Sequence, residues 1–105
     1  MKQFHHIGLV AREPVPDEMY FESLQVWGTD PTNDPNKIEW VRFKPESPLA
    51  STPVAKMPHV SWQVDDLDAE LEGKEVVVGP LTVAPGVRIA YFMMDGALVE
   101  YLEVT

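Results

Sequence analysis

Two stretches of the chain alternate apolar and polar residues with the two-residue period of a strand that buries one face. They lie within FHHIGLVA (4–11) and HVSWQV (59–64), and each contains a histidine at its start. The first strand is predicted to span 3–11. Further strands are predicted at 37–45, 75–80, 86–94 and 97–104. The Asp95-Gly96 pair between the last two is a strong hairpin signal.

Two segments that follow the histidine-containing strands carry helix signals. Residues 14–28 open on two prolines followed by Asp17 and Glu18, which are favoured at the positive end of a helix, so this segment is predicted to be helical. Residues 65–73 offer Asp65 or Asp66 as an N-cap and Gly73 at the C-terminal end. The second half therefore is predicted to contain a strand, a helix and three more strands.

The two halves of the chain have similar layouts. His6 and His59 each open a strand that leads toward a predicted helix, and Glu39 and Glu100 each stand second in a later strand, IEWVRF or VEYLEV. Between the halves, residues 46–58 contain three prolines and are predicted to form an extended connector that acts as a hinge. The pattern indicates a duplicated module, with module one at about 1–45 and module two at about 59–105.

Length and composition limit the class of protein. A chain of 105 residues with 45% hydrophobic content suits a single domain, 1–105, with one core. The sequence contains no apolar run long enough to span a bilayer and no signal-peptide pattern, so we expect a soluble cytoplasmic protein that does not bind membranes. Because cysteine is absent, any metal must be held by nitrogen and oxygen atoms.

The charge balance argues against nucleic acid as a partner. Acidic residues outnumber basic ones by 17 to 8, the formal net charge is -9, and there is no run of Lys or Arg. Binding to a phosphate backbone requires such a basic footprint. A local cluster of Arg12, Arg42 or Arg88 still has the charge to hold one carboxylate or phosphate.

Three segments of the chain carry a resemblance to a known family: FHHIGLVA (4–11), HVSWQVDDLDAELEG (59–73) and DGALVEYLEV (95–104). They resemble segments of the vicinal oxygen chelate superfamily. This superfamily includes glyoxalase I, methylmalonyl-CoA epimerase, extradiol dioxygenases and bleomycin-resistance proteins. The resemblance extends over nearly the whole chain. It implies a single glyoxalase-like α+β domain in which two βαβββ modules form a curved mixed sheet around a cavity. The first module is shortened here, because residues 29–36 are turn formers that replace much of two strands.

The resemblance also implies a metal site. Its ligands would be His6, Glu39, His59 and Glu100, with Glu39 in the position that varies most within the superfamily. Two imidazoles and two carboxylates suit a divalent ion such as Zn, Mn, Fe, Co or Ni, and coordination by water can leave positions open for a substrate. Such an ion can stabilise an enolate while a carboxylate takes the adjacent proton, and Glu100 or Glu39 is the candidate catalytic base.

Strand parity assigns further residues to the pocket. Ser61 and Gln63 share the face of His59, and Leu102 shares the face of Glu100, so these three are predicted to line a substrate pocket. Gly8 shares the face of His6 and is predicted to leave space beside the metal. Two other residues fall on the opposite faces: His5 is predicted to point toward the helix layer or solvent, and Glu103 is predicted to be solvated.

We therefore expect a metal-dependent lyase or isomerase that acts on a small molecule with vicinal oxygens. The alternative is a metal-free protein of the same fold that binds and sequesters a small apolar compound. A third hypothesis is a dioxygenase that uses His6, His59 and Glu100 as a facial triad and leaves Glu39 unliganded. The resemblance additionally implies a homodimer.

Overall fold

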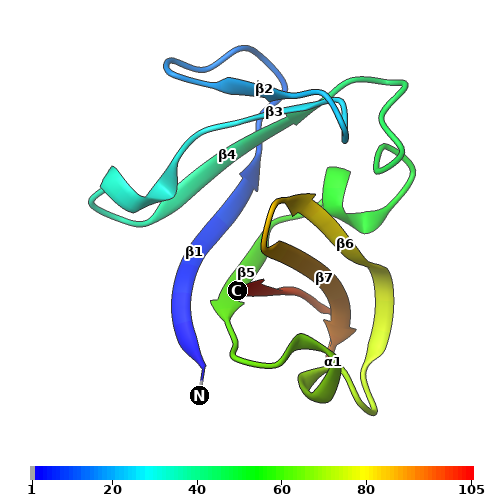
Figure 1. Ribbon diagram of the computed structural model, residues 1–105. Coiled ribbons are helices and arrows are strands. Elements are labelled where there is room, and N and C mark those ends of the chain that lie inside the picture. Colours follow the sequence, from blue (N-terminus) through cyan, green and yellow to red (C-terminus); the bar gives the residue numbers. More distant parts are fainter. Residues whose placement is uncertain (1) are drawn as a thin grey trace.

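In a computed structural model, residues 2–105 are described and form one mixed sheet of eight strands in the order β2-β3-β4-β1-β5-β8-β7-β6. The sheet is strongly curled into a half-barrel, with β2, β3 and β4 above and β5, β6 and β7 below in Figure 1. The strands are β1 (Gln3–Val10), β2 (Met19–Phe21), β3 (Val26–Gly28), β4 (Ile38–Phe43), β5 (His59–Gln63), β6 (Glu75–Ala84), β7 (Val87–Met94) and β8 (Ala97–Val104). The helices are short: two 3-10 turns, η1 (Pro31–Asn33) and η2 (Pro53–Ala55), and α1 (Leu67–Glu70). No helix within residues 2–105 is long and apolar enough to cross a membrane.

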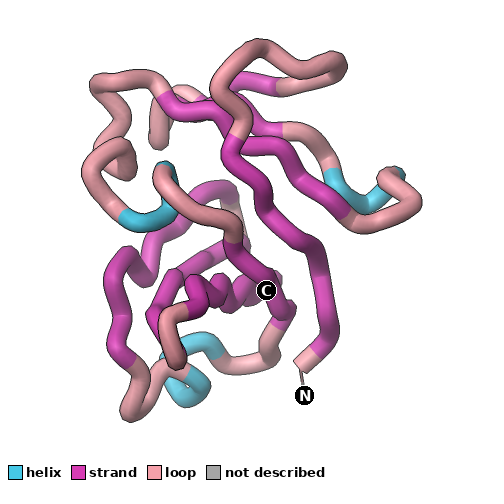
Figure 2. Tube along the Cα trace, turned by 180° about the vertical axis from the view of Figure 1, so that it is seen from behind, coloured by secondary structure: helices cyan, strands magenta, loops and turns pink. Residues whose placement is uncertain are grey.

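The strand order is symmetrical about the pair formed by β1 and β5. β1 runs parallel to β4, β5 runs parallel to β8, and β1 and β5 pair with each other in antiparallel orientation. Viewed from behind in Figure 2, β1 extends from the lower half into the upper half. The same four-strand arrangement therefore occurs twice, which confirms the predicted α+β fold with a curved mixed sheet.

The helix predicted over 14–28 is wrong. This segment contains the hairpin of β2 and β3, in which Met19 pairs with Gly28 and Phe21 pairs with Val26. Aromatic and β-branched residues are concentrated here, and their preference for strands outweighs the helix-start signal of the prolines. Module one thus keeps four strands, and it is shortened by the loss of its helix rather than by the loss of strands.

The segment 46–58 is not extended as predicted. It forms successive turns and η2, and it buries Leu49 and Val54 in a core cluster with residues of β6, β7 and β8. The Ser47 hydroxyl donates to the Leu24 carbonyl at 2.6 Å and accepts the Leu49 N–H at 3.1 Å. Through these contacts the segment packs against both halves of the molecule, so the expectation of a hinge is wrong. The boundaries of the two modules remain a prediction.

Module two follows its sequence signals closely. The Asp66 side chain accepts the Ala69 N–H at the start of α1, and Gly73 has a φ of 76° after its end. Asp95 and Gly96 both have positive φ, as the tight turn between β7 and β8 requires. The helix itself is only one turn long, shorter than the predicted 65–73.

Glu103 is buried, contrary to the prediction that it is solvated. Its carboxylate accepts the Leu67 N–H at 2.9 Å and pairs with Arg88 Nε at 3.0 Å. The Arg88 guanidinium and the Leu67 N–H hold the pKa of Glu103 below its usual range. The outer face of β8 is covered by α1, and a second core cluster fills this layer with Leu67 and Phe92 among its members.

Candidate metal centre

The four predicted ligands lie on the four central strands of the sheet. His6 is on β1, Glu39 on β4, His59 on β5 and Glu100 on β8. Glu39 pairs with Gly8, two residues after His6, and Glu100 pairs with Ser61, two residues after His59. The glutamate of each module therefore has the same register relative to its histidine, which gives all four side chains one face of the sheet.

Three of the four side chains bring a ligand atom to a common point. His6 Nε2 lies 3.3 Å from His59 Nε2 and 3.3 Å from Glu100 Oε1, and His59 Nε2 lies 3.5 Å from Glu100 Oε1. Ligand atoms placed about 2.0–2.2 Å from a tetrahedral metal are separated from one another by roughly 3.3–3.6 Å. This buried group of three could therefore bind a metal.

Glu39 lies to one side of this group. Its Oε1 is 3.2 Å from His6 Nε2, and its side chain is 25% exposed, whereas Glu100 is buried. His6, His59 and Glu100 each have a ligand atom within 4.8 Å of the other two. Among residues 2–105, Glu39 does not belong to this group. The fourth predicted ligand is thus adjacent to the group but more accessible.

The chemistry of these atoms fits a cation at the centre. Two imidazole nitrogens and a carboxylate oxygen point at one another. Glu100 Oε1 is buried, yet it accepts no hydrogen bond of good geometry from residues 2–105. Burial favours the uncharged forms of these groups, but attraction between them is stronger. The Glu100 and Glu39 carboxylates raise the pKa of His6 to about 9 against the effect of burial, and the imidazoles of His59 and His6 lower the pKa of Glu100 far below its usual range.

Metal binding should therefore displace a proton from His6. Because its pKa is about 9 in the metal-free protein, this imidazole is protonated at neutral pH, and Nε2 must lose the proton before it can bind a metal. We expect release of about one proton for each Zn²⁺ bound at pH 7, and an apparent affinity that rises with pH until it levels off near pH 9. Titration calorimetry in two buffers of different ionisation enthalpy measures the proton count. Equal enthalpies in both buffers would contradict it.

Gly8 makes room for one of the imidazoles. A Cβ built on Gly8 would lie 2.0 Å from His59 Cε1 and 2.3 Å from His59 Nε2. The room left by the missing side chain of Gly8 is therefore occupied by the His59 ring, and it is not the open space beside the metal that was predicted. Ser61 on the same face is fully buried, and its hydroxyl has no hydrogen-bond partner within residues 2–105.

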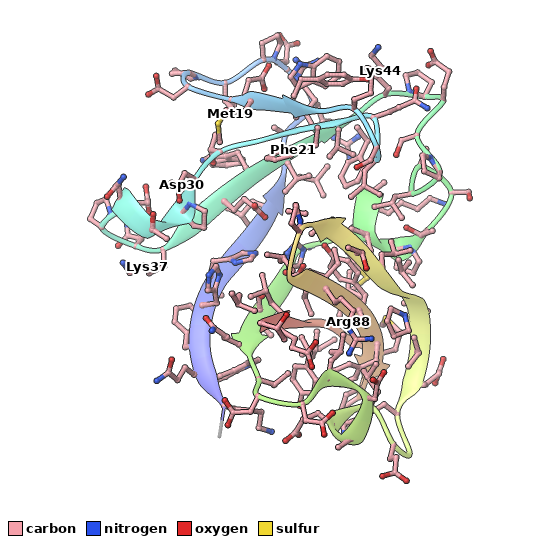
Figure 3. The ribbon with its side chains drawn as sticks, in the orientation of Figure 1. Met19, Phe21, Asp30, Lys37, Lys44 and Arg88 are labelled. Atoms are coloured by element: carbon pink, nitrogen blue, oxygen red, sulfur yellow. The ribbon has the colours of Figure 1, made fainter. Side chains whose placement is uncertain are left out.

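A cavity of about 180 Å³ adjoins the candidate metal centre. His6, Glu39, Glu100 and Leu102 lie in its wall, whereas Ser61 and Gln63, which were predicted to line the pocket, do not. Most of the wall is apolar and comes from both halves of the half-barrel and from the segment 46–58. Besides Leu102, its apolar residues include Phe21, Leu24, Val26, Pro31, Val41, Phe43, Leu49, Val54, Val83 and Ile89. Figure 3 labels Phe21 beneath β2, on the side that faces the second module.

Tyr91 is a buried polar residue of the cavity wall. Its ring packs edge-on against His59 with centroids 5.3 Å apart, and it pairs with Glu100 across β7 and β8. Burial, and then the neighbouring Glu100 carboxylate, raise the pKa of Tyr91 well above its usual value. Tyr91 therefore stays neutral and packs beside His59 and Glu100, two members of the candidate metal centre.

His5 also lines the cavity, so its predicted orientation toward the helix layer or solvent is wrong. The register between β1 and β5 shifts between Phe4 and His6, which is a β-bulge with one extra residue. Because the bulge breaks the alternation, His5 and His6 are near each other, and their Nδ1 atoms are 2.7 Å apart. Burial and the adjacent His6 lower the pKa of His5, which favours its neutral form. The only sequence signal for this arrangement was the His5-His6 pair itself.

Comparison with known proteins supports the fold. No protein-family model and no curated protein matches the sequence. Among solved structures, a hypothetical protein from Bacillus halodurans C-125 matches with a TM-score of 0.63 and 16% identity over 99% of this chain and 95% of that chain. Methylmalonyl-CoA epimerase from Mycobacterium tuberculosis matches with a TM-score of 0.62 and 15% identity over 97% of this chain and 87% of that chain. The chain thus shares the fold of these two structures, which is the fold that the resemblance of its sequence motifs implied.

Proposed function

We propose that this protein is a metal-dependent lyase or isomerase of glyoxalase-like type that acts on a small molecule with two adjacent oxygen atoms. The observation that carries the proposal is the convergence of His6 Nε2, His59 Nε2 and Glu100 Oε1 beside an apolar cavity. The fold is shared with an epimerase, which is consistent with this class of reaction.

The residues of the centre have separate roles in the proposed reaction. A divalent ion, when bound, would supply a positive charge that polarises the paired substrate oxygens and favours loss of the neighbouring proton. His6, His59 and Glu100 are buried and would hold this ion in a fixed position. Glu39 lines the cavity and is partly exposed, so its carboxylate has the freedom to accept the proton and to return it.

The cavity limits the substrate. Its volume of about 180 Å³ slightly exceeds that of an engineered cavity of about 150 Å³ that holds benzene, so only a group of similar size can enter. No Lys or Arg of residues 2–105 lines the cavity, and two carboxylates do. The proposed substrate group is therefore neutral or carries a single negative charge, because a phosphate ester or a dicarboxylate would have no cation apart from the metal.

A second function is favoured by one specific observation. The three converging ligands are two histidines and one carboxylate, which is the facial set that non-haem iron oxygenases use. In that case Glu39 would not contact the iron. The proposed lyase or isomerase needs Glu39 as its base and the oxygenase does not, so the effect of removing the Glu39 carboxylate on the rate separates the two functions.

The Glu39→Gln variant tests the proposal. We expect it to retain its affinity for Zn²⁺ or Ni²⁺ within roughly tenfold and to lose at least about 100-fold in rate, because a glutamine cannot accept the proton. The rate is measured by NMR as deuterium exchange in D₂O at the carbon next to the carbonyl of small hydroxyketones and 2-oxoaldehydes. The matched control is Glu75→Gln, at the exposed start of β6.

Exchange at an unchanged rate in Glu39→Gln would exclude this residue as the base. Oxygen consumption by the Fe²⁺-loaded protein with small catechols, with unchanged activity in Glu39→Gln, would support the oxygenase instead. Binding of small apolar compounds without any metal affinity would support the sequestration protein, which the apolar cavity wall also allows.

A further inference from the structure

We infer that His5 is a positioning residue of the metal centre, whose Nδ1 accepts a hydrogen bond from His6 Nδ1–H and so directs Nε2 of His6 toward the metal. This inference rests on the proposed metal site. Its geometric basis is the contact of 2.7 Å between the two Nδ1 atoms, with the rings inclined by 74°. That separation is short enough for a direct hydrogen bond between two ring nitrogens.

The two nitrogens of a neutral imidazole share a single proton, so the role of one nitrogen determines the role of the other. Nε2 of His6 faces His59, Glu100 and Glu39. When Nε2 binds a metal through its lone pair, the proton of the His6 ring must be on Nδ1. His6 is buried, and its Nδ1–H therefore needs an acceptor, which His5 Nδ1 provides.

The same reasoning fixes the protonation of His5. If its Nδ1 accepts, its own proton must be on Nε2. Within residues 2–105, no hydrogen bond involves His5 Nε2, so no other group of the protein opposes this tautomer. The pair thus forms a defined chain of donors and acceptors that begins at the metal position and ends at the cavity wall, which His5 lines.

The backbone places His5 specifically for this contact. In a regular strand His5 and His6 would point to opposite faces, and the β-bulge between Phe4 and His6 removes that constraint. Module two has no counterpart, because the residue before His59 is Pro58, which has no hydrogen-bonding side chain. His5 is therefore an addition to one module and not a consequence of the repeat.

Two variants of His5 test the inference. His5→Asn retains an acceptor oxygen near the position of Nδ1, whereas His5→Phe retains a ring without an acceptor. Loss of a hydrogen-bond partner of a metal ligand typically costs 10- to 100-fold in metal affinity. We expect a loss of that size in His5→Phe and a change of less than about threefold in His5→Asn, measured by competition for Zn²⁺ with a chromophoric chelator.

A spectroscopic measurement on the unmodified protein gives an independent result. In the ¹⁵N NMR spectrum of the Zn²⁺-loaded protein, we expect a protonated Nδ1 for His6, and for His5 an unprotonated Nδ1 and a protonated Nε2. Thermal unfolding of both variants shows whether they fold, and if His5→Phe does not fold, the NMR spectrum decides.

Equal Zn²⁺ affinity of His5→Phe and the unmodified protein, or a protonated Nδ1 in His5, would overturn the positioning role while the metal site remained intact. Failure of the unmodified protein to bind Zn²⁺, Mn²⁺, Fe²⁺, Co²⁺ and Ni²⁺ alike would overturn the proposed function and the role of His5 together. The two failures are therefore distinguishable.

Discussion

Replacement of Glu100 by glutamine should lower Zn²⁺ affinity by more than 100-fold. Loss of a residue that only hydrogen-bonds to a metal ligand already lowers metal affinity by roughly 10- to 100-fold. The effect should be larger for Glu100, because it supplies the single carboxylate of the converging group itself. The substitution keeps the size of the side chain, but it removes the negative charge that faces His6 Nε2 at 3.3 Å and His59 Nε2 at 3.5 Å. Competition with a chromophoric chelator at constant pH measures the change.

The control for Glu100→Gln is Glu75→Gln, which neutralises an exposed carboxylate at the start of β6. This control removes the same charge from the molecule as Glu100→Gln, but at an exposed position. Because salt screens exposed charges, the Zn²⁺ affinity of Glu75→Gln should stay within about threefold of the original. Thermal unfolding of both variants checks that they fold. Unchanged zinc stoichiometry and affinity in Glu100→Gln would exclude Glu100 as a ligand.

Replacement of Gly8 by alanine should abolish metal binding by a different route. The added Cβ would lie 2.0 Å from Cε1 and 2.6 Å from Nδ1 of His59, and atoms cannot approach so closely. Gly8 and His59 are paired residues of β1 and β5, so the ring must turn away while the backbone stays paired. We expect loss of the bound metal and a loss of about 1–3 kcal/mol in the free energy of unfolding, which is the usual cost of overpacking.

Gly28→Ala is the matched control, because Gly28 is also a strand glycine on the cavity wall. Its added Cβ would meet Phe21 Cε2 at 3.3 Å, and Phe21 is partly exposed and able to move. Elemental analysis and chemical denaturation of both variants should show normal metal content in Gly28→Ala alone. Full metal content in Gly8→Ala would contradict the packing of His59 against Gly8.

The second module was predictable because its signals are local and agree with one another. Asp66, Gly73 and the Asp95-Gly96 pair act within a few residues of their own positions, and the structure places a cap, a helix end and a hairpin there. The repeat of His and Glu was also informative. It identified four strand positions of equal register, and the structure brings three of these side chains together and places Glu39 beside them.

The remaining features depend on tertiary contacts that no short segment reveals. Two prolines and two acidic residues indicated a helix at 14–28, but the aromatic residues of β2 and β3 instead complete the sheet that faces the cavity. Glu103 was expected in solvent because strand parity does not show that α1 covers that face of β8. The bulge that turns His5 toward the cavity likewise cannot be recognised from the pattern of apolar and polar residues in β1.

The metal content of the untagged protein tests the central claim most directly. The protein is loaded separately with Zn, Mn, Fe, Co and Ni, freed of excess metal and subjected to elemental analysis together with a His59→Ala variant. We predict about one equivalent of at least one metal in the unmodified protein and its loss in His59→Ala, because His59 is one of the three converging ligands. Absence of metal under every condition, or equal content in His59→Ala, would contradict the account.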